Sequence, residues 1–148
     1  MRLNRRWRGL ARLTGAMRHA LFVCFWDLDV EALTHVSVDT SRLLWRMGLG
    51  LRNDNNKGEV IHSHVINGNR YRVLKNGRHK EVDGTCDAPW VSAKCIKLHY
   101  KLEAERRLDV VIHEALHAGL WCVGEEAVAE GASDIARFLW RLGYRFKA

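Results

Sequence analysis

The chain has 148 residues, about the length of one compact domain, and its 47% of hydrophobic residues excludes a wholly disordered protein. The formal net charge of +7 is concentrated near the N-terminus: six arginines precede the first acidic residue, Asp27, whereas the remainder carries 18 basic and 17 acidic residues. The excess charge is therefore expected in an N-terminal arm and not throughout a folded body.

Four cysteines are spread along the chain without a Cys-x-x-Cys pair: Cys24, Cys86, Cys95 and Cys122. This spacing is not that of a disulfide framework and predicts free thiols. The apolar run 20–26 is too short to span a bilayer, and no small-x-small cleavage site follows it. We therefore expect a cytoplasmic protein that does not enter a membrane.

Residues 1–57 show helical periodicity. Two amphipathic helices that end near Gly48 and Gly50 are predicted from the spacing of Trp7, Leu10, Leu13, Met17, Leu21, Leu43, Leu44 and Met47. The polar, turn-rich stretch 52–58 is the best candidate for a boundary. We predict a helical, basic N-terminal extension over residues 1–57 and a second domain over residues 58–148.

Strand patterns follow this boundary. Residues 60–66 and 71–74 flank Asn67-Gly68-Asn69 and predict a β-hairpin, and a further turn is predicted at residues 75–77. Residues 84–91 are expected to form a loop. A half-buried strand over residues 95–102 is predicted from the alternation of Ile96, Leu98, Tyr100 and Leu102 with Lys97, His99 and Lys101.

Two helices are predicted over residues 103–119 and 125–142, and the short connection 121–124 makes them antiparallel neighbours. The order of hairpin, strand, helix and helix predicts an α+β domain. Its helices should lie on one side of a small antiparallel sheet.

An H-E-x-x-H motif, His113-Glu114-Ala115-Leu116-His117, lies within the first of these two helices. Imidazoles at positions i and i+4 can converge on one tetrahedral zinc ion. Glu114 lies about 60° around the helix from His117, where it can act on a zinc-bound water without ligating the metal. Composition alone gives roughly 1 chance in 40 of such a match, and the alternative is a pair of solvent-exposed histidines.

A third zinc ligand is expected from the start of the next helix. Glu125 projects onto that helix's apolar stripe, whereas Glu126 projects about 100° away from it. Since a carboxylate on a buried face needs a compensating cation, Glu125 is favoured as the ligand and Glu126 is kept as a candidate. Both glutamates can instead complement the positive end of the helix dipole.

The segment from residue 84 to 146 carries several short matches to one group of proteins. They are GTCD at 84–87, LDVVIHEALHA at 108–118, EEAV at 125–128 and DIARFLWRLGYR at 134–145. With these the segment resembles the small phage and bacterial zinc metallopeptidases of the SprT-like and ImmA/IrrE-like (gluzincin) kind. The resemblance implies a zincin-type active-site helix, zinc on His113 and His117, Glu114 as general base, and Glu125 or Glu126 as third ligand.

Two features depart from this resemblance. SprT-type proteases take a histidine as third ligand, and no histidine follows His117. Residues 1–57 show no such resemblance.

The sequence thus predicts a cytoplasmic zinc metallopeptidase for peptide or protein substrates, with Glu114 as general base on a zinc-bound water. An edge-like strand over residues 95–102 is expected to align the peptide, and Tyr144 and Arg145 are candidate oxyanion stabilisers. One alternative is a zinc-stabilised regulatory or interaction domain without protease activity. The other is a nucleic-acid-binding module that uses the Arg-rich arm.

Overall fold

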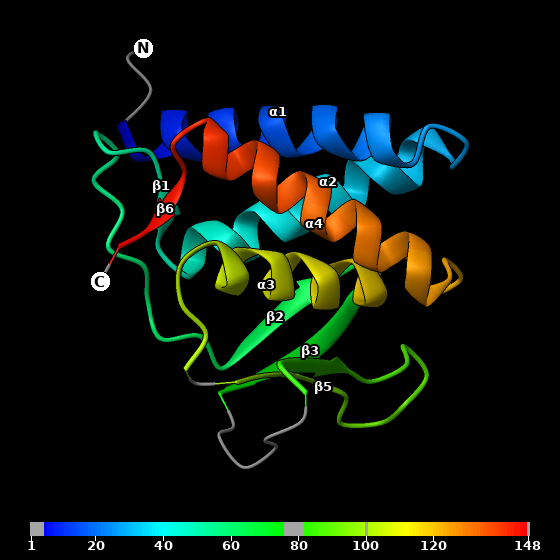
Figure 1. The fold of residues 1–148 in the computed structure, drawn as a ribbon. Coiled ribbons are helices and arrows are strands. Elements are labelled where there is room, and N and C mark those ends of the chain that lie inside the picture. Colours follow the sequence, from blue (N-terminus) through cyan, green and yellow to red (C-terminus); the bar gives the residue numbers. More distant parts are fainter. Residues whose placement is uncertain (1–4, 76–81, 100, 148) are drawn as a thin grey trace.

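The structure, a computed structural model, describes residues 5–75, 82–99 and 101–147. Its elements in these ranges are α1 (Arg5–Cys24), α2 (Val30–Arg46), β1 (Leu49–Gly50), β2 (Ser63–Ile66), β3 (Asn69–Lys75), β4 (Gly84–Cys86), β5 (Cys95–Leu98), α3 (Ala104–Gly119), α4 (Glu125–Arg141) and β6 (Arg145–Phe146). The protein is α+β, as predicted, and its helices lie on one side of a four-stranded sheet (Figure 1). None of the described helices is both long and apolar enough to cross a membrane.

Strands β2 and β3 form the predicted hairpin. They are antiparallel, and Ile66 pairs with Asn69, so the turn contains only Asn67 and Gly68. These two residues have φ angles of 50° and 77°, the left-handed backbone that a type I′ turn requires. The hairpin is confirmed, although β2 begins at Ser63 and not at residue 60. The further turn predicted at residues 75–77 falls mostly outside the described residues.

The four-stranded sheet is mixed, so the prediction of an antiparallel sheet was wrong for one of its strand pairs. The strand order is β2-β3-β5-β4, with β5 parallel to β3 and antiparallel to β4. Strand β4 lies within the stretch 84–91 that was expected to be a loop. Because the chain runs back as β4 and then inserts β5 between β3 and β4, the β3–β5 pair has to be parallel.

The position of β5 overturns a second expectation. Ile96 and Leu98 are buried as predicted, but β5 ends at Leu98 and has neighbours on both sides. It is therefore a central strand, and its backbone is not available to pair with a peptide. The edge on this side of the sheet belongs to β4.

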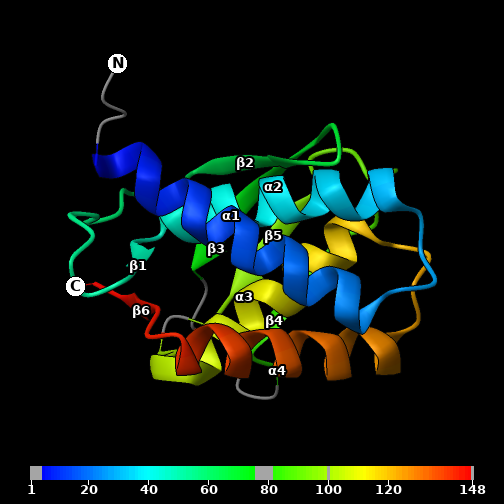
Figure 2. The same ribbon diagram turned by 90° about the horizontal axis from the view of Figure 1, so that it is seen from above.

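The N-terminal helices belong to the same hydrophobic core as the rest of the protein. Helix α1 packs on α2 and α4, and α2 packs on α3 (Figure 2). Buried side chains from both sides of position 57 form one cluster, which includes Leu13, Leu21, Leu44, Leu108 and Ile135. A two-stranded pairing of β1 with β6 also joins the two parts.

The basic residues of α1 accordingly lie on a packed helix and not on a free arm. Arg8, Arg12 and Arg18 are exposed, whereas Leu13 and Met17 of the same helix are fully buried. The amphipathic pattern of the helix thus orients it, with its apolar stripe on α2 and α4 and with Arg8, Arg12 and Arg18 toward solvent.

Candidate metal centre

Helix α3 brings the two histidines of the motif together. Its apolar face is buried as predicted, including Leu108, Val111, Ile112, Ala115 and Leu116. This packing turns the side chains of His113 and His117 into a cleft, where they are 21% and 15% exposed. Their Nε2 atoms are 3.1 Å apart, so both nitrogens face the same point.

The carboxylate of Glu125 completes a three-residue cluster with these histidines. Glu125 is the first residue of α4. Its Oε1 lies 3.0 Å from Nε2 of His113, and its Oε2 lies 2.6 Å from Nε2 of His117. The short connection after α3 allows this approach, because it returns the chain to the C-terminal end of the helix that carries His117.

The reason for favouring Glu125 was nevertheless wrong. Its side chain is 71% exposed, because the first turn of α4 extends beyond the region where the apolar stripe is covered. Glu126 is also exposed, and in the described part of the chain it does not belong to the group of potential metal ligands formed by His113, His117 and Glu125.

Glu114 lines the same cleft as this cluster and is only 5% exposed. Strand β4 covers it at Gly84, where a Cβ atom would lie 3.0 Å from both Cγ and Oε1 of Glu114. Burial, followed by the negative charge of Glu125, raises the pKa of the Glu114 carboxyl group from 4.5 to about 7. The side chain therefore exchanges a proton readily near neutral pH.

Cys86, also on β4, lies close enough to Glu114 to respond to its charge. Burial, together with the carboxylates of Glu114 and Asp87, raises the pKa of its thiol to about 12. Because the thiolate is the form that binds metals, this environment disfavours Cys86 as a ligand.

The cluster opens into a cleft of about 440 Å³. Three of its lining residues were missed as site residues: Asp83, Asp109 and Trp121. Asp109 lies one helical turn before His113, and its charge acts on that imidazole. The i−4 spacing is a sequence signal that could have identified it, because a histidine ligand commonly pairs with a carboxylate.

The aromatic and charged walls of the cleft come from different elements. The Trp121 ring lies 6.2 Å from the His117 ring and meets Trp90 edge-on at 5.6 Å. At the other end Arg106 forms ion pairs with Asp83 and Asp109. The sequence places Trp121 only in the short connection between two helices, so its position in the cleft depends on the tertiary arrangement.

Other residues considered from the sequence lie elsewhere. In the described residues, the lining of this cleft contains none of the polar-face residues of the strand expected to align the peptide: Lys97, His99 and Lys101. Tyr144 and Arg145 follow the other end of α4 from Glu125, where Arg145 stacks 3.5 Å above the Trp140 ring. The expected oxyanion roles for Tyr144 and Arg145 are therefore not supported by their positions.

The donor set fits a zinc ion chemically. Zinc in catalytic sites takes three protein ligands, drawn from imidazole nitrogens and carboxylate oxygens. With bonds of about 2.0–2.1 Å in a tetrahedron, two ligand atoms are roughly 3.3 Å apart. The two Nε2 atoms are 3.1 Å apart, and each lies within 3.0 Å of one of the two Glu125 oxygens. The same contacts also form an ion pair when a histidine is protonated, so metal content is the property to measure.

Comparisons of the chain with protein-family models, with curated proteins and with solved structures find no match. The chemistry of the cleft is therefore inferred from its own residues.

Proposed function

We propose that the protein is a zinc-dependent metallopeptidase in which His113, His117 and Glu125 hold the metal and Glu114 is the general base. The observation that carries this proposal is the convergence of three donor groups in an open cleft that a buried carboxyl group, that of Glu114, also lines. A pair of solvated histidines would not explain why a carboxyl group in the same cleft is buried at the cost of its hydration.

The residues of the cleft divide the chemistry between them. When bound, zinc would polarise the scissile carbonyl and lower the pKa of a water molecule. The Glu114 carboxylate accepts the proton of the attacking water and then donates it to the leaving amine nitrogen. A pKa of about 7 suits both steps, because the group is neither a very weak base nor a very weak acid at neutral pH.

Strand β4 can align an extended substrate, in place of the strand originally expected. The backbone carbonyl of Asp83 accepts a hydrogen bond from the backbone amide of His99 at 2.8 Å. The backbone amide of Asp87 donates a hydrogen bond to the backbone carbonyl of Cys95 at 3.0 Å. In an antiparallel pair the bonded residues alternate, so the backbone groups of Gly84 and Cys86 point away from β5. A peptide pairing with them would pass beside the metal cluster.

The test combines metal content with proteolysis. Elemental analysis of tag-free protein is expected to find about one zinc per chain in the wild type and in Glu114→Gln, and none in His113→Ala. Of these three proteins, only the wild type should cleave a dye-quenched unfolded protein. His62→Ala, which changes an exposed histidine outside the cleft, is the matched control and should behave like the wild type.

Two results would contradict the proposal. Full cleavage by Glu114→Gln would show that Glu114 is not the general base. Absence of zinc from folded wild-type protein, even after zinc is added, would show that the cluster is not a zinc site. Zinc binding without any cleavage by the wild type would instead favour a metal-stabilised regulatory domain.

A further inference from the structure

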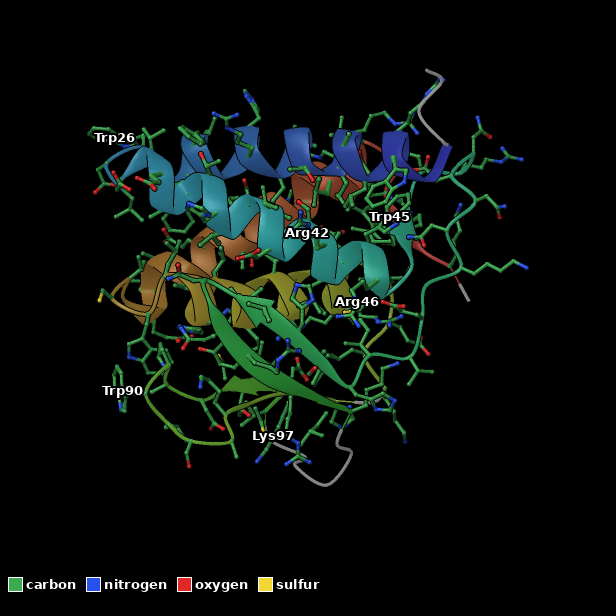
Figure 3. All side chains as sticks on the ribbon, turned by 180° about the vertical axis from the view of Figure 1, so that it is seen from behind. Trp26, Arg42, Trp45, Arg46, Trp90 and Lys97 are labelled. Carbon is green, nitrogen blue, oxygen red and sulfur yellow. The ribbon has the colours of Figure 1, made fainter. Side chains whose placement is uncertain are left out.

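A second cleft, of about 670 Å³, lies between α1, α2 and β2 and shares no lining residue with the first. Trp7 and Leu10 of α1 form one wall, Arg42 and Arg46 of α2 lie above β2 (Figure 3), and the hairpin forms the other wall. The cleft is thus built from parts of the molecule that the proposed peptidase chemistry does not use.

The charge of this cleft is positive and incompletely neutralised. Of its three arginines, Arg46 forms an ion pair with Glu59. Asp39 is the one acidic residue in the lining, and its carboxylate accepts a hydrogen bond from the backbone amide of Asn67 at 2.9 Å. Within the ranges that the structure describes, Arg42 and Arg70 have no carboxylate partner. Two guanidinium groups therefore face the cleft with their charge available to an anion.

The positive surface continues across the outer face of the sheet. In β3, Tyr71 and Val73 point into the core, so the exposed Arg70 and Arg72 share the opposite face. Lys97 lies between two buried residues of β5 and is seen below the sheet, away from the helices (Figure 3). Among the described residues neither Arg72 nor Lys97 forms an ion pair. We call Arg42, Arg70, Arg72 and Lys97 the basic track.

An exposed aromatic ring lies at the start of this track. Trp7 is 60% exposed although it lines the cleft, whose floor is apolar through Leu10, Trp45 and Val65. A large exposed indole beside unpaired guanidinium groups matches a ligand that carries both flat rings and regularly spaced negative charges. Single-stranded nucleic acids have this chemistry, since bases stack on aromatic side chains while phosphates contact cations.

We propose that the second cleft and the basic track bind a single-stranded nucleic acid, with a base stacked on Trp7 and phosphates along Arg42, Arg70, Arg72 and Lys97. A single strand is favoured over a duplex because a base can enter the cleft only when it is unstacked from its neighbours. This site does not depend on the proposed peptidase activity, as it shares no residue with the metal cluster.

The test is fluorescence anisotropy with a labelled oligothymidylate of about 15 nucleotides, a length at the upper end of what one single-strand-binding fold covers. A hairpin duplex and a labelled polyglutamate peptide are compared at about 50 and 200 mM salt. The double variant Arg42→Ala/Arg70→Ala removes two proposed contacts. The control Arg52→Ala/Arg141→Ala removes the same charge from exposed positions outside the track. Circular dichroism verifies that all variants are folded.

We expect the wild type to bind the single strand most tightly of the three probes. Loss of Arg42 and Arg70 should weaken this binding about tenfold or more and reduce the slope of log affinity against log salt by about 0.7 for each lost contact. Trp7→Ala should weaken single-strand binding about tenfold, without affecting the duplex. The Arg52/Arg141 control should change the affinity by less than about twofold.

Other outcomes overturn the proposal. Absence of binding at low salt excludes the site. Equal weakening of binding by the two double variants would show that the net charge of the protein, and not the basic track, accounts for the binding. Tighter binding of the duplex, with no effect of Trp7→Ala, excludes stacking of a single strand. Preference for polyglutamate would assign the surface to an acidic peptide.

Discussion

Replacing Glu114 by glutamine should change the stability of the metal-free protein in a way that depends on pH. The carboxyl group is buried, and its pKa in the folded protein is raised to about 7 from 4.5. Glutamine has nearly the same shape but no charge to desolvate. The variant therefore keeps the packing against Gly84 and β4 while removing the cost of a buried charge.

The magnitude follows from the two pKa values. An acid whose pKa is raised on folding holds its proton more tightly in the native state, so protonation stabilises that state. This contribution is complete below pH 4.5 and is lost as the pH rises to about 7. At 1.36 kcal/mol per pH unit the full loss is roughly 3 kcal/mol, of which about 2.5 kcal/mol falls between pH 5 and pH 8.

Urea denaturation at pH 5 and pH 8, in the presence of a chelator, measures the effect. The wild-type free energy of unfolding should fall relative to that of Glu114→Gln by about 2.5 kcal/mol between the two pH values. Other titratable groups are present in both proteins, so their contributions largely cancel in the difference. Glu126→Gln, at an exposed position on α4, is the matched control and should give a difference near zero.

Parallel stabilities of wild type and Glu114→Gln across this pH range would refute the reasoning. Such a result would mean that Glu114 is hydrated in solution, or that β4 does not cover it. The same outcome would also weaken its assignment as a base with a pKa near neutrality.

Three further predictions concern the metal, the cleft and the core. Glu125→Gln should weaken zinc binding by at least about tenfold, measured by competition with a chelating dye, whereas Glu126→Gln should leave it unchanged. Gly84→Ala should lower proteolysis while zinc is retained, because the new methyl group would press on Glu114; normal activity would show that β4 moves freely. Leu21→Ala, at a fully buried position of α1, should lower the free energy of unfolding of the whole protein by about 2–5 kcal/mol. A separable N-terminal extension would instead give two transitions, only one of them shifted.

Local patterns in the sequence were sufficient for helices α3 and α4 and for the β2–β3 hairpin. The positions of helices α3 and α4 follow from apolar residues recurring at helical spacing, and the β2–β3 hairpin follows from Asn67-Gly68, because few residue pairs tolerate the backbone of that turn. The meeting of His113 with His117 is likewise local, since residues four apart lie on one face of any helix.

The arrangement around these elements depended on contacts between distant residues. Nothing in the stretch 84–91 resembles a strand by alternation, yet β4 forms there because β5 supplies its hydrogen bonds. The burial of Glu114 and its raised pKa depend on that strand. A helical wheel alone therefore could not predict them.

The tertiary structure likewise determines which of Glu125 and Glu126 contacts the two histidines. A wheel projection specifies which face of a helix a residue occupies, but not where that helix begins relative to its neighbour. The helix–helix connection sets this start, and it brings the exposed Glu125 carboxylate to both histidines. The same holds for α1, because its periodicity indicates an amphipathic helix but does not identify the elements that pack on it. The sequence by itself determined which side of each element is apolar. Only the tertiary structure decided what covers that side, because burial depends on residues far away along the sequence.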